Sequence, residues 1–225
     1  MARHLDLEEQ EQLDELKHFW NQWGNLITWA LIAVLGAFAA WNGWQYWQRH
    51  QATQASALYD EVERSAAGGD TARLQQAVKD IEDKYGGTSY ASQAALLAAR
   101  VLAEKGQLDA AKASLQWVAT EASDEGHKAV ARLRLAGLLA DAKAYDEALK
   151  QLAAAMPKEF EPLAADRRGD IYNLQGKRDQ ARAEYTKAWQ GLVPGNDYRV
   201  LVEVKLTSLG VDVQSLKPAT ESAKS

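Results

Sequence analysis

The 225-residue sequence contains no cysteine, four prolines and four histidines. The absence of cysteine excludes a disulfide framework and a thiolate metal site, although it leaves the cellular compartment open. After residue 50, alanine, leucine, glutamine, lysine and glutamate dominate, and the β-branched residues never form the alternating runs of strands. These features predict an all-α fold.

The sequence also lacks a basic surface. Its 26 lysines and arginines are outnumbered by 31 aspartates and glutamates, and most of the acidic excess lies in residues 1–19. The remainder is nearly neutral, whereas a nucleic-acid-binding domain needs lysine and arginine clustered on one face. We therefore expect no nucleic acid partner.

Groupings of catalytic residues are missing as well. The histidines, His4, His18, His50 and His127, form no His-Glu-x-x-His pattern and no visible pair with a serine. Gly68-Gly69-Asp70 lacks the lysine and the preceding strand of a phosphate-binding loop, so a helix break explains it better. We expect no enzyme, and neither a cofactor nor a metal site.

The most informative segment that is present is an uncharged stretch from Phe19 to Gln48, which holds six of the eight tryptophans. Those near its two ends are Trp20 and Trp23, and Trp41, Trp44 and Trp47. About 20 apolar residues span the hydrocarbon core of a bilayer, and tryptophans favour its interfaces. Leu26 to Trp44 is therefore predicted to be the apolar part of a single transmembrane helix over residues 20–47.

A cleaved signal peptide is the alternative, because Ala37-Phe38-Ala39 has the small-x-small form of a signal-peptidase site. The acidic segment of residues 1–19, here called the acidic lead, is a poor start for a signal peptide, and the uncharged stretch continues past Ala39. A retained anchor is therefore favoured. Arg3, Lys17 and Arg49 barely distinguish the two orientations. Because a short lead before a long domain usually stays inside, we expect a cytoplasmic N-terminus.

A short pattern recurs after the anchor. Gly106-Gln107-Leu108-Asp109-Ala110-Ala111 is echoed by Ala144-Tyr145-Asp146-Glu147-Ala148 and by Gly176-Lys177-Arg178-Asp179-Gln180-Ala181. The aligned alanines Ala111, Ala148 and Ala181 are 37 and 33 residues apart, close to the tetratricopeptide period of about 34. The pattern predicts a tetratricopeptide-like solenoid of helical hairpins over residues 48–212.

Each predicted hairpin has small residues where its helices cross and large residues on the same faces. The small residues of the first helices are Ala99, Ala136 and Gly169, and the large residues of the second helices are Leu115, Leu152 and Tyr185. A degenerate first hairpin is predicted over residues 52–84, with a break at Gly68-Gly69-Asp70. Tyr198 to Leu209 is predicted to be a last helix, and residues 213–225 a disordered tail.

A solenoid of helix pairs forms a concave surface lined by its first helices, which favours protein binding. In the general tetratricopeptide register, the groove positions are Leu96, Arg100, Leu133, Gly137, Asp166, Asp170 and Asn173. Some tetratricopeptide domains clamp a C-terminal carboxylate with lysine and asparagine at several of these positions, and that clamp is missing here, where Asn173 is the one asparagine and no position holds lysine. The acidic segment 1–19 is a second candidate surface, with Leu13, Leu16 and Trp20 on one helical face, although a solvated face is the favoured explanation of this pattern.

Together, the lead Leu7-Glu8-Glu9-Gln10-Glu11-Gln12-Leu13-Asp14, the tryptophan-rich span and the degenerate repeats resemble the YfgM family, the ancillary subunits of the bacterial Sec translocon. The resemblance implies a single-pass protein of the bacterial inner membrane with a periplasmic repeat domain. Its implied partners are channel subunits of the Sec translocon, a membrane-anchored periplasmic chaperone of the prolyl-isomerase type and, through the cytoplasmic lead, a stress-response regulator.

Two functions follow as hypotheses. In the first, the protein is a non-enzymatic translocon accessory that scaffolds the chaperone and helps to transfer secreted proteins from the channel. In the second, it is a membrane-anchored signalling protein that acts on the regulator through its acidic cytoplasmic segment. Deletion of residues 2–18 distinguishes them, because only the first predicts that binding through the repeats is retained.

Overall fold

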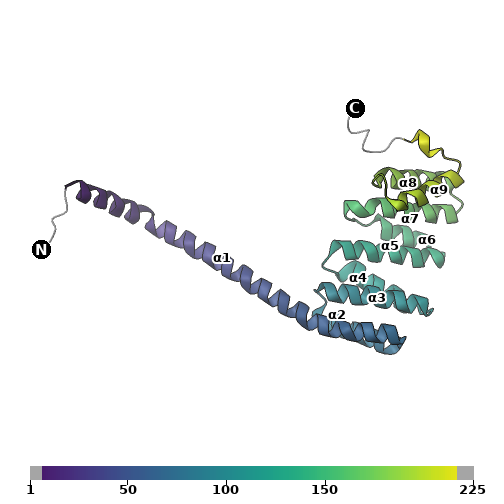
Figure 1. Cartoon of the computed structure of the whole chain (residues 1–225), viewed down its shortest axis with the longest axis horizontal. Coiled ribbons are helices and arrows are strands. Elements are labelled where there is room, and N and C mark those ends of the chain that lie inside the picture. The colour runs from purple at the N-terminus through teal and green to yellow at the C-terminus, as the bar shows by residue number, and fades with distance from the viewer. Residues whose placement is uncertain (1–6, 217–225) are drawn as a thin grey trace. The chain divides into compact units, whose positions relative to one another are not determined.

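The computed structural model describes the backbone of residues 7–216 and the side chains of residues 13–216, and no strand occurs among them (Figure 1). The helices are α1 (Leu7–Gly68), α2 (Thr71–Tyr85), α3 (Ser89–Glu104), α4 (Leu108–Glu121), α5 (Glu125–Asp141), α6 (Tyr145–Ala153), α7 (Glu161–Leu174), α8 (Arg178–Gly191) and α9 (Asp197–Ser208). Two short 3-10 helices, η1 (Lys158–Phe160) and η2 (Val213–Ser215), complete them. The chain divides into two compact units, residues 1–50 and residues 51–225.

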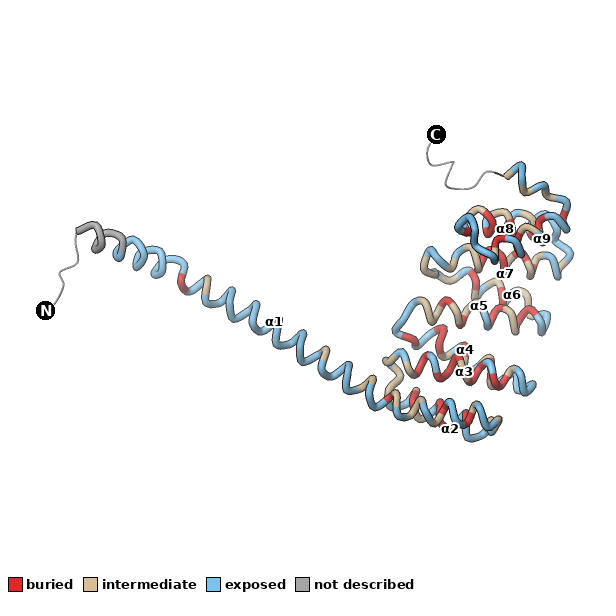
Figure 2. Tube along the Cα trace, in the orientation of Figure 1, coloured by how far each residue is buried: buried red, intermediate tan, exposed pale blue. Residues whose placement is uncertain are grey.

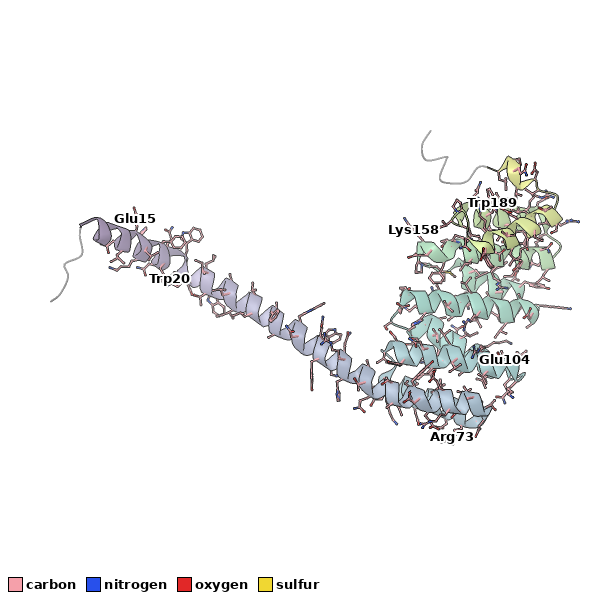
Figure 3. All side chains as sticks on the ribbon, viewed as in Figure 1. Glu15, Trp20, Arg73, Glu104, Lys158 and Trp189 are labelled. Carbon is pink, nitrogen blue, oxygen red and sulfur yellow. The ribbon has the colours of Figure 1, made fainter. Side chains whose placement is uncertain are left out.

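In the first unit, the described backbone of residues 7–50 belongs to α1, and almost all of the described side chains of residues 13–50 are exposed (Figure 2). Phe38 is 67% exposed and Leu35 63%, values that a core helix of a soluble protein would not show. α1 is also the one described helix long and apolar enough to cross a membrane. The prediction of a single N-terminal candidate membrane helix is confirmed, and Figure 3 labels Trp20 near its start.

The second unit is a stack of antiparallel helical hairpins, α3 with α4, α5 with α6, and α7 with α8 (Figure 1). Before these hairpins, the C-terminal part of α1 pairs with α2. An ion pair between Glu61 of α1 and Arg73 of α2 joins the two helices. α1 ends at Gly68 and α2 begins at Thr71, as the break at Gly68-Gly69-Asp70 predicts. The expected architecture, one membrane helix followed by tetratricopeptide-like hairpins, is confirmed.

The small residues of the repeat pattern lie at the helix crossings. Ala111, Ala148 and Ala181 are fully buried, and the large residues four positions later, Leu115, Leu152 and Tyr185, are buried beside them. At Gly169, a Cβ atom would lie 2.5 Å from the ring of Tyr185, so this crossing has no room for a side chain. The repeat spacing thus reflects close contact between the helices of each hairpin.

Three equivalent turns connect the helices of the last three hairpins. Gly106, Lys143 and Gly176 each follow a first helix with a left-handed backbone, with φ of 75°, 61° and 74°. At each turn the next amide donates a hydrogen bond back to the helix, for example from Ala144 to the carbonyl of Leu139 at 2.8 Å. Glycine adopts this conformation without strain, whereas lysine does not.

The last helix begins one residue earlier than predicted, because Asn196 caps it by accepting a hydrogen bond from the amide of Tyr198. Val213–Ser215 form a 3-10 helix where the sequence predicts no regular structure, since Asp212 accepts a hydrogen bond from the amide of Gln214. The rest of the predicted tail, residues 217–225, and the start of the acidic lead, residues 1–6, lie outside the described residues.

Candidate protein-binding groove

The first helices of three successive hairpins, α3, α5 and α7, together with Leu115 of α4, line one concave pocket of about 470 Å³. Its lining residues are Ala99, Arg100, Ala103, Leu115, Leu133, Arg134, Gly137, Leu138, Asp141 and Arg167. Apolar side chains and backbone form most of the surface, with three guanidinium groups and a single carboxylate among them. The volume falls in the range of about 300–1,000 Å³ that is typical of ligand pockets.

Three of the predicted groove residues, Arg100, Leu133 and Gly137, come together in this pocket. Leu96 is not among the lining residues, and its side chain on α3 is only 9% exposed. Its carbonyl oxygen lies 3.5 Å from Nη1 of Arg134, so its backbone borders the groove.

Arg134 and Arg167 line the pocket but are absent from the predicted set. The two arginines are 33 residues apart, the same separation as Ala136 and Gly169, so they occupy one repeat position. The guanidinium of Arg167 lies 4.0 Å from the point where a Cβ atom of Gly137 would be. The charged group of Arg167 on α7 thus lies over the backbone of α5 at Gly137, at a distance that an alanine Cβ would also allow.

Asp166 and Asp170 are engaged within the fold instead. Asp166 is 1% exposed and accepts hydrogen bonds from Tyr198 at 2.6 Å and from Lys205 at 2.8 Å to each oxygen. Asp170 accepts one from Tyr185 at 2.8 Å and lies 2.7 Å from Nζ of Lys205. α9 thus covers this part of α7, while the remaining predicted residue, Asn173, is exposed near the end of α7.

The phenols of this cluster stay protonated. Burial, followed by the hydrogen bond to Asp170, raises the pKa of Tyr185 far above its ordinary value. Burial and the hydrogen bond to Asp166 raise the pKa of Tyr198 in the same way. Both hydroxyl groups therefore remain donors to the two carboxylates throughout the neutral range.

A second charged cluster connects α7 with α8. Glu184 is buried, and it lies 2.7 Å from Nε of Arg168 and 2.5 Å from Nζ of Lys187. Burial acts to raise the pKa of Glu184, but the hydrogen bonds and charges of Lys187 and Arg168 together outweigh it and lower that pKa. Arg168 also donates to the carbonyl of Leu152 at 3.1 Å, which ties the α7–α8 hairpin to the α5–α6 hairpin.

The end of the stack is closed by an aromatic contact. The guanidinium of Arg199 on α9 lies 3.8 Å from the ring centroid of Trp189 on α8, which is labelled in Figure 3. The indole nitrogen of Trp189 donates a hydrogen bond to Glu203 at 2.8 Å. Among the described residues, no three or more histidines, aspartates or glutamates lie close enough together to hold a metal ion.

The structure therefore has the form of a repeat protein with one N-terminal candidate membrane helix and a concave groove. Residues 17–211 match a protein-family model described as a tetratricopeptide repeat-like domain. The chain belongs to the YfgM family of ancillary translocon subunits. Ancillary translocon subunits are a non-catalytic kind of protein.

Three relatives named as ancillary SecYEG translocon subunits align over most of the chain. The Neisseria gonorrhoeae protein is 30% identical over 210 residues, which cover 93% of this chain and all of the relative. The Haemophilus influenzae protein is 30% identical over 82% of this chain and 90% of its own length. The Escherichia coli protein is 29% identical over 90% of this chain and 97% of its own.

Proposed function

We propose that this protein is a non-enzymatic accessory of the Sec translocon in the bacterial inner membrane. It scaffolds a membrane-anchored periplasmic chaperone of the prolyl-isomerase type and helps to transfer secreted proteins from the channel. The observation that carries this proposal is the alignment with an ancillary SecYEG translocon subunit over that relative's full length, which includes both the anchor and the repeats.

The exposed apolar face of α1 supports the membrane location. Side chains such as Leu31, Val34 and Phe38 are more than half exposed. A bilayer would bury them at about 25 cal/mol per Å² of apolar surface, which is strongly favourable over a span of this length. The tryptophans at both ends of the span, Trp23 and Trp44 among them, suit the two interfaces.

In the proposed orientation, the acidic lead is cytoplasmic and the repeats are periplasmic. The cysteine-free sequence makes this testable without a background of reactive thiols. Single cysteines at Glu15 and Glu104, both exposed and labelled in Figure 3, are treated with a membrane-impermeant maleimide on intact spheroplasts. We expect labelling at residue 104 only, and labelling at residue 15 only would reverse the orientation.

The groove supports the scaffolding role, because it offers apolar surface and hydrogen-bond donors on the repeat unit. A photocrosslinking residue at Leu133 inside the groove is compared with one at Lys150, exposed on the second helix α6. We expect Leu133 to capture the prolyl-isomerase-type chaperone or a secreted chain, and Lys150 to capture neither. Crosslinkers within residues 26–44 are expected to capture channel subunits, and recovery of none of these proteins from either set contradicts the proposal.

The acidic lead supports a secondary role in contacting a cytoplasmic stress-response regulator. Leu13, Leu16 and Trp20 are exposed in α1 at spacings that place them on one helical face. Deletion of residues 2–18 is expected to abolish capture of the regulator while leaving the crosslinks from Leu133 intact. Loss of both sets of crosslinks would show instead that the lead, rather than the groove, organises the partners.

A further inference from the structure

The pocket between α3, α5 and α7 combines an apolar floor with three arginines, and its charge is not balanced by the residues that line it. Leu115, Leu133 and Leu138 supply apolar surface, whereas Arg100, Arg134 and Arg167 supply positive charge. Asp141 is the only carboxylate in the lining. A concave site of this composition suits a ligand with both an apolar group and negative charge.

The hydrogen-bonding capacity of these three arginines is largely unused. Arg100 lies 3.9 Å from Glu104, and both side chains are about two-thirds exposed, at 64% and 68%. Arg167 lies 3.7 Å from Asp170, which already binds Lys205 and Tyr185. Charge-assisted hydrogen bonds are normally about 2.7–2.9 Å long, so both contacts are loose.

Arginines elsewhere in the same repeats are held much more tightly. Arg168 lies 2.7 Å from Glu184 and donates to the carbonyl of Leu152 at 3.1 Å. By contrast, the protein contact of the Arg134 guanidinium is a carbonyl at 3.5 Å, the outer limit of a hydrogen bond. Structural arginines in this fold have close partners, and the arginines of the pocket have distant ones.

The positions of the arginines also fit an extended ligand. Each comes from a different first helix, Arg100 from α3, Arg134 from α5 and Arg167 from α7, so the charges follow the axis of the stack. The Arg167 guanidinium lies next to Gly137, 4.0 Å from the point where a Cβ atom would be, and so reaches from α7 to the surface of α5. A guanidinium binds a carboxylate with two parallel hydrogen bonds, which gives it an advantage over lysine at such a site.

We propose that this pocket binds an internal acidic segment of a partner protein. One large apolar side chain of that segment enters between Leu133 and Leu138, and aspartates or glutamates on both sides of it bind Arg100, Arg134 and Arg167. The inference deepens the proposed function, because it rests on the groove being the protein-binding surface of the repeat unit and specifies the chemistry of what it binds.

The test uses the full-length protein in detergent micelles and fluorescent peptides that are acetylated and amidated, so that no terminal carboxylate is present. The probe peptide carries a central leucine-phenylalanine pair flanked by glutamates, and in the control peptide glutamine replaces every glutamate. We expect binding, measured by fluorescence anisotropy, to be at least about tenfold tighter for the acidic peptide at low salt. The preference should shrink on raising the salt from about 0.05 M to about 0.3 M, because partly exposed charges are screened.

Arg134→Gln combined with Arg167→Gln is expected to abolish the preference for the acidic peptide. Arg178→Gln, an exposed arginine at the start of the second helix α8, is the matched control and should bind like the unmodified protein. Arg134→Glu with Arg167→Glu should reverse the preference in favour of a peptide with lysines at the same places. Unchanged circular dichroism spectra would verify that the variants are folded.

Several results would overturn the inference. These are equal binding of the acidic and glutamine peptides, binding only of a peptide with a free C-terminal carboxylate, binding unaffected by the arginine substitutions, and no binding of any peptide. Crosslinks from residues 26–44 to channel subunits would still support the proposed translocon role in each of these cases. Failure of the pocket and failure of the proposed function are therefore distinguishable.

Discussion

Nζ of Lys205 on α9 lies 2.8 Å from both carboxylate oxygens of Asp166 on α7. The carboxylate is 1% exposed, and the hydroxyl group of Tyr198 completes its hydrogen bonding at 2.6 Å. The sequence places Asp166 in the register of Leu96 and Leu133, where the preceding repeats have leucine. A charge in place of this leucine lets the last helix, α9, dock on the α7–α8 hairpin through an ion pair.

The first prediction concerns this pair. Asp166→Ala leaves the Tyr198 hydroxyl without its acceptor and removes one of the two carboxylates that neutralise Lys205. Breaking a buried charge pair typically costs about 3–5 kcal/mol, so α9 should undock. Hydrogen exchange measured by mass spectrometry should accelerate throughout residues 197–208.

The control for this prediction is Asp179→Ala, which removes an exposed carboxylate 3.2 Å from Arg182 on α8. An exposed pair of this kind contributes about 0–1 kcal/mol, so exchange in α9 should stay unchanged. Equal protection of α9 in the protein and in both variants would contradict a docking role for Asp166.

The second prediction compares two glycines on neighbouring first helices. Gly169→Ala would place a Cβ atom 2.5 Å from the Tyr185 ring, and the ring must move away from Asp170 to accept it. Overpacking of this kind costs about 1–3 kcal/mol, which a urea titration would show as a lower midpoint. Gly137→Ala meets nothing closer than 4.0 Å and should be stabilising by up to about 1 kcal/mol, because alanine favours helices. A similar loss in both variants would argue against a tight crossing at Gly169.

The helical hairpins were predictable because their information is local and periodic. Ala111, Ala148 and Ala181 recur at one register, and their burial follows from the close approach of two helices. The apolar span was equally predictable, since length and the absence of charge suffice to identify it. Lys143 lies at the same turn position as Gly106 and Gly176 and shares their left-handed backbone, but a lysine in the sequence does not indicate that conformation.

The candidate site was only partly predictable because it depends on which helices meet. Arg100, Leu133 and Gly137 occupy groove positions that the general register identifies. Arg134 and Arg167 occupy equivalent positions in two successive repeats, but this position is not one that the register assigns to the groove. Asp166 occupies a groove position too, but its partner Lys205 is 39 residues away on a helix outside the repeat pattern. Periodicity within the repeats carries no information about that contact.

The third prediction concerns the backbone of Lys143. Its φ of 61° is the left-handed conformation that Gly106 and Gly176 adopt at the equivalent turns. A left-handed backbone costs a non-glycine residue about 1–2 kcal/mol, so Lys143→Gly should raise the melting temperature of the repeat unit by a few degrees. The neighbouring Ala142→Gly, at a φ of −77°, relieves no such strain and should lower it instead. Stabilisation by both glycines, or by neither, would contradict the assignment of strain to Lys143.

The last prediction concerns Glu82 on α2, which lies beside Trp117 of α4 in the groove between two second helices. Burial, with a smaller effect of Asp83, raises the pKa of Glu82 from 4.5 to about 7, and Lys79 only partly opposes this. Since the pKa is higher in the folded than in the unfolded state, the folded state binds the proton more tightly. The contribution of Glu82 to stability is therefore greatest below the unfolded pKa and decreases as the pH rises through about 7.

We expect the urea concentration at the unfolding midpoint of the full-length protein to decrease as the pH is raised from about 5 to about 8. Glu82→Gln should flatten this dependence, and at the upper pH the variant should be more stable than the unmodified protein. Glu121→Gln, on the exposed last turn of α4, should keep the slope of the unmodified protein. A slope that Glu82→Gln leaves unchanged would show that other groups account for the pH dependence. A steeper slope would mean that the charged form of Glu82 is the one that the fold stabilises.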